Sequence, residues 1–538
     1  MKKLTRLLVP VMAAACLLAA CSSESSSGGS SAAVSSAQSG SQSAEVPGYV
    51  NKEGFPIVNE PITLSIFGSR DQNQAEWKEM LFFQKYQEMT GITLDFQEVP
   101  AQGFDEKKSL LFASNELPDL FVRSSLNESE VSMYGVSSQQ LLVLDPYLEA
   151  YAPNLYSIMQ ENEIVKVSQT TSDGHIYILP ELDFSDTGKM GFKQWINKTW
   201  LDKLDLKVPT TPEELKEVLI AFRDKDPNGN NTADEIPLGI REVSSIYVLG
   251  GSWGLEHQFA DTVNIKDGEV KYWLTDDRFK EYLTYLHELY SEKLLWQDYY
   301  KTDSRPVWRS NLSNALFGAF YMPYSDVFIN VEDQFIGYEP LKGPYGDQIW
   351  ADASTGVIAK GAFAVSSTCE YPEAALRWAD YFYSEEGSVF YRYGVEGETF
   401  TYDESKVPRI NDDILNASEG FMTALGKINL VPGGGGPNLI TNQTDGIVAS
   451  DLTKEVSAVL VPYLPETVYP RPSLDEATQE RVNAIRQDLE KYRDESVTKF
   501  IIGEWGFDQW DTYCDTLETI GLSELQQIYQ DAYDSLYK

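Results

Sequence analysis

Cysteine is scarce in this chain of 538 residues. Four are present, and two of them, Cys16 and Cys21, lie close to the N-terminus. The other two, Cys369 and Cys514, could form one disulfide at most, which excludes a scaffold held together by several disulfides. No cysteine spacing matches a zinc or haem site. The stability of the protein must therefore come mainly from hydrophobic cores.

Histidine and positive charge are also scarce. Only three histidines are present, namely His175, His257 and His287. The chain carries 43 Lys and Arg against 82 Asp and Glu, for a net charge of −39. This charge repels nucleic acids and anionic lipid headgroups, although it also serves plain solubility. We therefore expect neutral or cationic partners and no nucleic acid.

The N-terminal apolar run is too short to cross a membrane. Residues 7–20 fall below the roughly 20 apolar residues that a membrane-spanning helix needs. Three cations precede the run: Lys2, Lys3 and Arg6. This order predicts a lipoprotein signal peptide over residues 1–20 and a lipid-modified Cys21. Residues 21–55, rich in Ser and Gly, are then a flexible tether. We expect the protein on the extracellular face of the cell membrane, anchored by acyl chains such as palmitate.

The remaining chain, residues 56–538, is several times longer than a usual domain of roughly 100 to 150 residues, so two or more lobes are expected. Hydrophobic residues make up 42% of the chain, which is typical of a globular protein. Strand patterns at residues 62–67 and 92–96 flank a helical pattern over residues 77–89, which Gly91 is expected to end. Together with the apolar residues 120–122, this order predicts an α/β first lobe with a parallel sheet.

Ligands of such sheets bind beyond the carboxyl ends of the strands. Residues 68–70 and 123–125 follow two of the predicted strands, which places Arg70 and Arg123 at a candidate binding edge. The chain is expected to cross into a second lobe near residues 191–197. A helix beginning at Thr211 and Pro212 follows, because Glu214 completes a capping box.

Residues 224–235 alternate acidic and amide side chains in the pattern of a calcium loop. Calcium binds about six to eight oxygens, which such residues supply. In an EF-hand register, with Gly229 at the turn, the ligands are Asp224, Asp226, Asn228, the Asn230 carbonyl, Thr232 and Glu235. In a shorter register, with Asn231 at the turn, they are Asp226, Asn228, Asn230, the Thr232 carbonyl, Asp234 and Glu235. We predict a structural metal here, and the alternative is a solvated acidic turn.

Five segments together resemble one known family. They are residues 195–201, 209–211, 226–237, 372–378 and 384–397. The chain resembles the family 1 extracellular solute-binding lipoproteins of carbohydrate ABC transporters over nearly its whole body. The resemblance implies a two-lobed, periplasmic-binding-protein-like fold of type II with an interlobe hinge, a cleft for a sugar or oligosaccharide, and delivery to permease subunits. It also implies calcium in the shorter register, although Asp205 and Asn231 stand where the family usually has glycine.

Each lobe is predicted to contain two segments of the chain. Residues 56–182 and 357–400 form the first lobe. Residues 187–350 and 401–538 form the second lobe, with the calcium loop and a mostly helical C-terminal part. Repeated crossings between the lobes make a hinge, and a ligand that touches both lobes favours closure. We expect a monomer that is not an enzyme.

Sugar binding needs aromatic faces for the apolar side of each ring and planar polar groups for the hydroxyls. The candidates are Arg70, Arg123, Trp253, Tyr321, Tyr324 and Trp350. Each aromatic alone is more often part of a core, but Gly or Pro neighbours place this set near turns. Alternative functions are a receptor for a peptide or other small solute, a surface adhesin, and a cell-surface glycosidase, which needs only two carboxylates.

Overall fold

The computed structural model describes residues 46–536, apart from residues 242, 258–261, 302–303 and 329. The predicted signal peptide, Cys21 and most of the tether lie outside the described residues. Within the described part of the chain, no helix is long and apolar enough to span a membrane.

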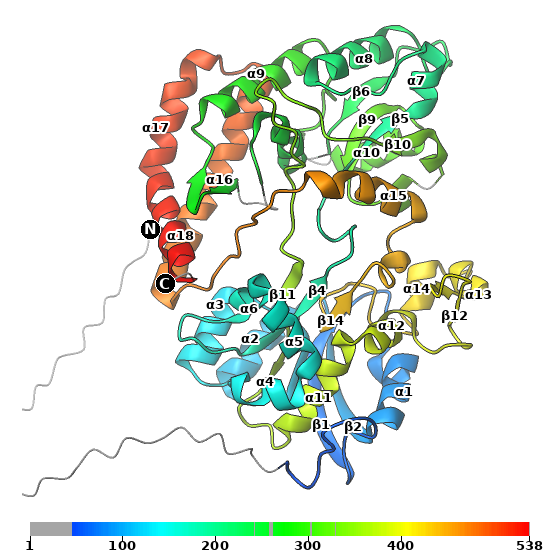
Figure 1. Ribbon diagram of the computed structural model, residues 1–538, viewed down its shortest axis with the longest axis vertical. Helices are drawn as coiled ribbons and strands as arrows, with labels where there is room; N and C mark the ends of the chain where they lie inside the picture. Colours follow the sequence, from blue (N-terminus) through cyan, green and yellow to red (C-terminus); the bar gives the residue numbers. More distant parts are fainter. Residues whose placement is uncertain (1–45, 242, 258–261, 302–303, 329, 537–538) are drawn as a thin grey trace, which may run out of the picture. The chain divides into compact units, whose positions relative to one another are not determined.

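A six-stranded sheet forms the centre of the first lobe (Figure 1). In the order β14-β4-β11-β3-β1-β2, the strands are Asn438–Ile440, Ile178–Asp183, Val357–Val365, Leu120–Leu126, Ile62–Arg70 and Ile92–Pro100. The three predicted N-terminal strands are confirmed, and β1 pairs in parallel with both β2 and β3. The sheet is nevertheless mixed, not purely parallel as predicted, because β11 runs antiparallel to β3 and β4. β11 returns from the second lobe and so enters the sheet in the opposite direction.

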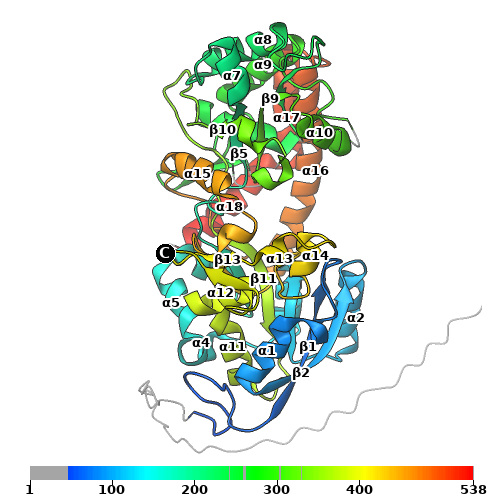
Figure 2. The same cartoon turned by 90° about the vertical axis from the view of Figure 1, so that its right-hand side faces the viewer.

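The helices of the first lobe come from two parts of the chain. They are α1 (Leu81–Thr90), α2 (Phe104–Ser114), α3 (Glu128–Val131), α4 (Asp145–Tyr151), α5 (Pro153–Glu161), α6 (Glu163–Gln169), α11 (Pro372–Asp380), α12 (Glu385–Tyr393), α13 (Asp412–Leu415) and α14 (Phe421–Leu425). Both α1 and α2 contact β2 (Figure 2). As predicted, α1 ends at Gly91, whose φ of 75° is a left-handed conformation that glycine adopts easily.

Residues 401–447, predicted in the second lobe, belong to the first. They include a short hairpin of β12 (Phe400–Tyr402) and β13 (Pro408–Ile410), and β14, which pairs with β4. Leu425 packs in one apolar cluster with Val389 and Tyr393 of α12. These contacts bury the segment against the first lobe, so the chain crosses over only after β14.

A four-stranded sheet, β10-β5-β9-β6, forms the centre of the second lobe. Its strands are Phe335–Gly337, Lys193–Asn197, Phe317–Met322 and Ile236–Gly239, and a separate hairpin joins β7 (Val263–Lys266) to β8 (Glu269–Tyr272). The helices are α7 (Lys198–Leu204), α8 (Pro212–Asp224), α9 (Asp277–Ser291), α10 (Ser304–Ser313), α15 (Asp451–Leu460), α16 (Glu476–Ile502), α17 (Trp510–Ile520) and α18 (Leu522–Leu536). The predicted helix start is confirmed, because Thr211 Oγ1 accepts a hydrogen bond from the backbone N of Glu214 at 3.2 Å.

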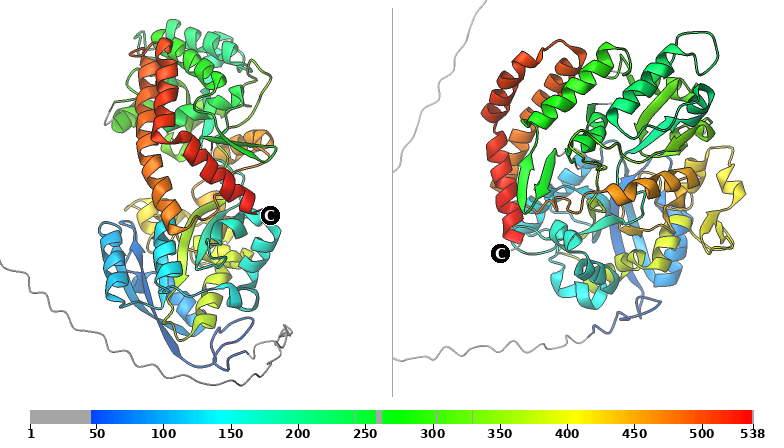
Figure 3. Two further views of the ribbon diagram at one scale, coloured as in Figure 1. Left: turned by 90° about the vertical axis from the view of Figure 1, so that its left-hand side faces the viewer. Right: turned by 45° about the horizontal axis from the view of Figure 1, so that its top comes forward.

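The long helix α16 contacts both lobes. It lies beside α17 (Figure 3) and packs against α9 of the second lobe. It also touches the first lobe, where Ser137 Oγ donates to Glu476 Oε2 at 2.9 Å and Asn483 Nδ2 donates to Ser129 Oγ at 3.3 Å.

The two described cysteines lie in different cores. Cys369 packs against the core of the first lobe and Cys514 against that of the second. Both are free thiols, so no disulfide forms between them.

Candidate functional site

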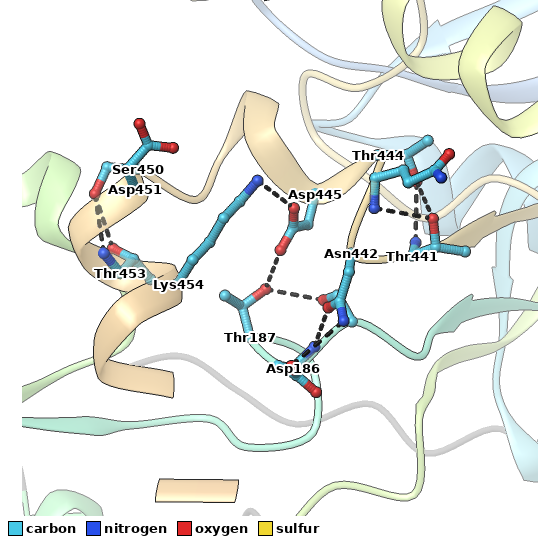
Figure 4. A network of polar contacts seen from close by, with 12 residues as sticks. Asp186, Thr187, Thr441, Asn442, Thr444, Asp445, Ser450, Asp451, Thr453 and Lys454 are labelled. Atoms are coloured by element: carbon cyan, nitrogen blue, oxygen red, sulfur yellow. Dashed lines mark hydrogen bonds and ion pairs between the residues drawn. The ribbon is translucent and has the colours of Figure 1, made fainter. Parts of the chain in front are cut away.

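Two connections between the lobes are tied together by polar contacts (Figure 4). Asp445, which follows β14, is buried, accepts a hydrogen bond from Thr187 Oγ1 at 3.1 Å and pairs with Lys454 Nζ of α15 at 2.8 Å. The backbone N of Asp186 donates to Asn442 Oδ1 at 2.7 Å. Burial raises the pKa of Asp445, against the opposing effect of Lys454. The β4–β5 and β14–α15 connections therefore form one hinge.

Lys193, the first residue of β5, stabilises the same hinge through hydrogen bonds from its buried side chain. Its buried Nζ donates to the backbone carbonyls of Thr187, Met190 and Gly191 at 2.7, 3.2 and 3.3 Å. It also lies 5.0 Å from the ring centre of Tyr324, a sugar candidate that the structure thus places against the hinge. Burial lowers the pKa of Lys193 to about 8.

The two arginine candidates lie at the edge of the first sheet. Arg70 is the last residue of β1 and is half-buried. Arg123 of β3 is 4% exposed, and its Nη1 donates to the carbonyls of Leu430 and Pro432 at 3.0 and 2.9 Å. Gln74 Nε2 donates to the same two carbonyls at 3.4 and 3.0 Å. Arg123 therefore supports a loop and does not face solvent.

The end of β3 has an unusual backbone. Arg123 and Ser125 have φ angles of 54° and 47°, which non-glycine residues rarely adopt. Lys108 of α2, whose side chain is almost fully buried, supports this turn. Its Nζ donates to the carbonyls of Ser124 and Ser125, each at 3.3 Å, and to Glu130 Oε2 at 2.9 Å. A buried cation thus holds the edge of the sheet in place.

A cavity of about 490 Å³ lies beside this edge. The lining includes residues 125–128 at the end of β3, residues 357–361 of β11, and Arg471 ahead of α16. Glu128 forms an ion pair with Lys360, and Lys360 Nζ donates to the carbonyl of Arg471 at 2.9 Å. The volume falls within the roughly 300 to 1,000 Å³ of small-molecule sites.

Three of the four aromatic candidates are core residues, which corrects the prediction. Trp253, Tyr321 and Trp350 are 4%, 2% and 1% exposed in the core of the second lobe. The ring centre of Trp253 lies 4.8 Å from that of Tyr282 and 5.3 Å from that of Tyr285. A ring covered in this way has no face for a sugar, and its glycine neighbours did not reveal its burial.

Residues 250–254, Gly-Gly-Ser-Trp-Gly, match the Gly-x-Ser-x-Gly pattern of serine hydrolases. In those enzymes the serine sits on a sharp strand-to-helix turn and is activated by a histidine. Here Ser252 lies in the 3-10 helix Val243–Trp253, is buried, and donates to the carbonyl of Leu341 at 2.9 Å. The motif therefore lacks the geometry of a nucleophile.

The predicted calcium loop folds around its own carboxylates. Asp226 Oδ1 accepts from the backbone N of Asn230 at 3.1 Å, and Oδ2 accepts from that of Asn231, also at 3.1 Å. Gly229 and Asn231 have φ angles of 77° and 59°, so both predicted turn positions are left-handed. Asp224 instead pairs with its neighbour Arg223 at 2.7 Å. The polar cluster thus begins at Asp226.

The other end of the loop carries two further carboxylates. Asp234 Oδ1 accepts from the side-chain amides of Asn228 and Asn230 at 2.9 and 3.0 Å. Glu235 Oε1 is buried and has no hydrogen-bond partner in the described part of the chain. Burial raises the pKa of Glu235, with a further rise from Asp234 and Asp226. Among the described residues, no group of three or more His, Cys, Asp and Glu is arranged to hold a metal ion by itself. A metal ion at this loop would need ligands besides the carboxylates, namely side-chain amide oxygens and backbone carbonyl oxygens, including the carbonyl oxygen of Thr232.

Comparison of the chain with known protein families identifies the family to which it belongs. The family described as bacterial extracellular solute-binding protein matches residues 71–389. The chain belongs to this family. This solute-binding protein is 25% identical over 524 residues to the fructooligosaccharide ABC transporter substrate-binding protein FusA of Streptococcus pneumoniae serotype 4, covering 93% of this chain and 95% of FusA. It is 23% identical over 501 residues to the polygalacturonan/rhamnogalacturonan-binding protein YtcQ of Bacillus subtilis, covering 87% and 92%.

Solved structures agree with the predicted fold. FusA in complex with kestose superimposes with a TM-score of 0.71 and 25% identity, over 88% of this chain and 99% of that one. An HMO-binding solute-binding protein from Bifidobacterium longum infantis gives a TM-score of 0.74 and 26% identity, over 89% and 99%. The predicted family and α/β solute-binding-protein fold are confirmed.

Sequence patterns did not reveal the buried charged residues of the hinge and the sheet edge. These are Lys108, Glu181, Lys193 and Asp445. A signal was present for one of them, because Glu181 interrupts the otherwise apolar residues 178–182. Charged side chains are almost never fully buried unless they have partners.

Proposed function

We propose that this solute-binding protein captures a neutral oligosaccharide outside the cell and delivers it, as a monomer and without altering it, to the permease subunits of an ABC importer. The observation that carries the proposal is the similarity along nearly the whole chain to FusA, which is described as a fructooligosaccharide-binding transporter component and has been solved with kestose. The hinge supports it, because a ligand that contacts both lobes favours their closed arrangement.

Isothermal titration calorimetry of residues 22–538 tests the proposal directly. The probes are kestose, fructo-nystose and fragments of polygalacturonan, with a tripeptide as the control. We expect saturable binding of a neutral oligosaccharide, an unchanged sugar by chromatography after incubation, and a smaller radius of gyration in small-angle scattering. Binding of the peptide alone would favour a peptide receptor, and cleavage of the sugar would favour a glycosidase.

We also propose that acyl chains on Cys21 anchor the protein to the extracellular face of the cell membrane. The order of cations, apolar run, small residues and Cys21 supports this, as does membership of an extracellular family. A lipid anchor on a flexible tether keeps the binding protein near its permease.

We propose further that residues 226–235 hold a structural calcium ion in the shorter register. The ligands would be the side chains of Asp226, Asn228, Asn230, Asp234 and Glu235 and the carbonyl of Thr232. Glu235 Oε1, which has no hydrogen-bond partner within the described part of the chain, supports a cation. The pairing of Asp224 with Arg223 supports a register that begins at Asp226. Bound calcium would offset the repulsion among the carboxylates and so hold the end of α8 against β6.

A further inference from the structure

A cluster of buried polar side chains, called the chamber below, packs tightly beneath a loop of four glycines, residues 433–436, at the edge of the first sheet. Four side chains meet there, and all are more than nine-tenths buried: Arg123 (4% exposed), Glu181 (6%), Tyr391 (2%) and Asn438 (0%). They come from β3, β4, α12 and β14, so the fold brings them together from distant parts of the chain.

The loop packs directly onto these groups. A Cβ atom on Gly433 would lie 2.4 Å from Arg123 Nη2. A Cβ atom on Gly436 would lie 2.0 Å from the Tyr391 hydroxyl and 3.4 Å from Arg123 Cγ. Both positions therefore require glycine, and the two distances from Gly436 place Arg123 and Tyr391 side by side under the loop.

Glu181 joins the loop to the rest of the chamber. The backbone N of Gly435 donates to Glu181 Oε2 at 2.8 Å, and Asn438 Nδ2 donates to Glu181 Oε1 at 3.2 Å. Asn438 Nδ2 also donates to the carbonyl of Gly436 at 3.0 Å. The Glu181 carboxylate thus accepts hydrogen bonds both from β14 of the sheet and from the glycine loop.

Three of the four side chains still have a polar atom without a partner. Within the described residues, Arg123 Nε, the Tyr391 hydroxyl and Asn438 Oδ1 are buried and make no hydrogen bond. Burying a polar group without a partner is costly, so natural proteins keep such groups rare. Three of them meet beneath this loop, where the hydroxyl groups of a ligand would supply the missing partners.

The loop has the construction of a lid. Its stem is clamped, because the carbonyls of Leu430 and Pro432 each accept hydrogen bonds from Arg123 and Gln74. Its tip consists of residues 433–435, whose φ angles of 85°, 57° and 82° suit glycine, the residue with the greatest backbone freedom. A clamped stem with a glycine tip allows the tip to move while the stem stays in place.

We propose that this chamber binds the hydroxyl groups of one terminal sugar ring when the glycine tip moves aside. The chemistry matches a polyol, because Arg123 Nε and the Tyr391 hydroxyl donate while Asn438 Oδ1 and Glu181 accept. Arg123 and Glu181 carry opposite charges, as do the nearby Arg392 and Asp71, so a neutral ring is favoured over an acidic one. This inference rests on the proposed carbohydrate function, and it names residues that determine which terminal sugar ring binds.

The substitution Tyr391→Phe separates binding from folding. It removes a hydroxyl that makes no hydrogen bond within the described residues, so the melting temperature should stay the same or rise. Affinity for kestose or fructo-nystose, whichever binds more tightly, should fall about five- to ten-fold, as expected for the loss of one hydrogen bond. The matched control is Tyr513→Phe, which removes a buried hydroxyl of the second lobe that has no hydrogen-bond partner among the described residues and should leave affinity unchanged.

The outcomes distinguish the chamber from the proposed function. If the parent protein binds sugar and Tyr391→Phe binds it equally well, the chamber is not the site. A fall in affinity that merely follows a fall in melting temperature would overturn it too. If the parent binds neither sugar, the proposed function itself fails. Hydrogen exchange at residues 433–436 should become faster with sugar bound, and slower exchange would contradict a displaced lid.

Discussion

Replacing Trp253 by alanine should destabilise the second lobe and leave the sugar site intact. The indole is almost fully buried and packs against Tyr282 and Tyr285. Truncating a buried tryptophan costs about 3 to 5 kcal/mol, because lost transfer energy and the new cavity add together. In a lobe of roughly 250 residues, each kcal/mol lowers the melting temperature by about 2 to 4 °C. The expected fall is therefore about 6 to 20 °C.

Differential scanning calorimetry of the parent, Trp253→Ala and Trp253→Phe measures this fall. Phenylalanine keeps part of the ring contact with Tyr282, so its melting temperature should lie between the other two. Sugar titrations at a temperature where all three proteins are folded should give the same affinity. An unchanged melting temperature with weakened sugar binding would refute the buried placement of Trp253 and return it to the ligand site.

Three further predictions concern the calcium loop, the pH dependence of stability and the lipid anchor. Calcium should raise the melting temperature of the parent protein and a chelator should lower it, whereas Asp226→Ala and Glu235→Ala should melt alike in both; a parent indifferent to chelation would rule the metal out. Burial raises the pKa of Glu256 from 4.5 to about 7, so the stability it contributes is fully present below pH 4.5 and is lost as the pH rises through about 7. In denaturant titrations, Glu256→Gln should remove this pH-dependent loss of stability, which is about 1 to 3 kcal/mol. A variant whose stability varies with pH as the parent's does would argue against a raised pKa of Glu256. Cys21→Ala should abolish labelling by a fatty-acid analogue, and persistent labelling would place the lipid elsewhere.

The α/β core of the first lobe could be predicted because local patterns determine it. Residues 62–67 show the strand pattern, and Gly91 ends the next helix at the expected place. The position of residues 401–447 could not be predicted in the same way. β14 has three residues, too few for a periodic pattern, and it joins the sheet only by pairing with β4, which is far away in the sequence.

The candidate site was harder to predict than the fold. Arg123 could be placed at the sheet edge from the strand that carries it, but its burial depends on a loop that arrives from residues 430–436. Trp350 has turn residues around it, yet tertiary packing turns its ring inward. Turn signals describe the backbone, whereas exposure of a side chain depends on what the rest of the chain lays over it.

Helix α16 has a mechanical consequence for the whole molecule. Its 27 residues make a rod about 40 Å long. Ser129 and Ser137 hold its first turns at the first lobe, whereas Phe500, near its other end, lies in the core of the second. Such a rod is a lever: a rotation of about 10° at Glu476 carries Ile502 through about 7 Å. A slight tilt where α16 meets the first lobe is thereby amplified at the opposite end of the second lobe.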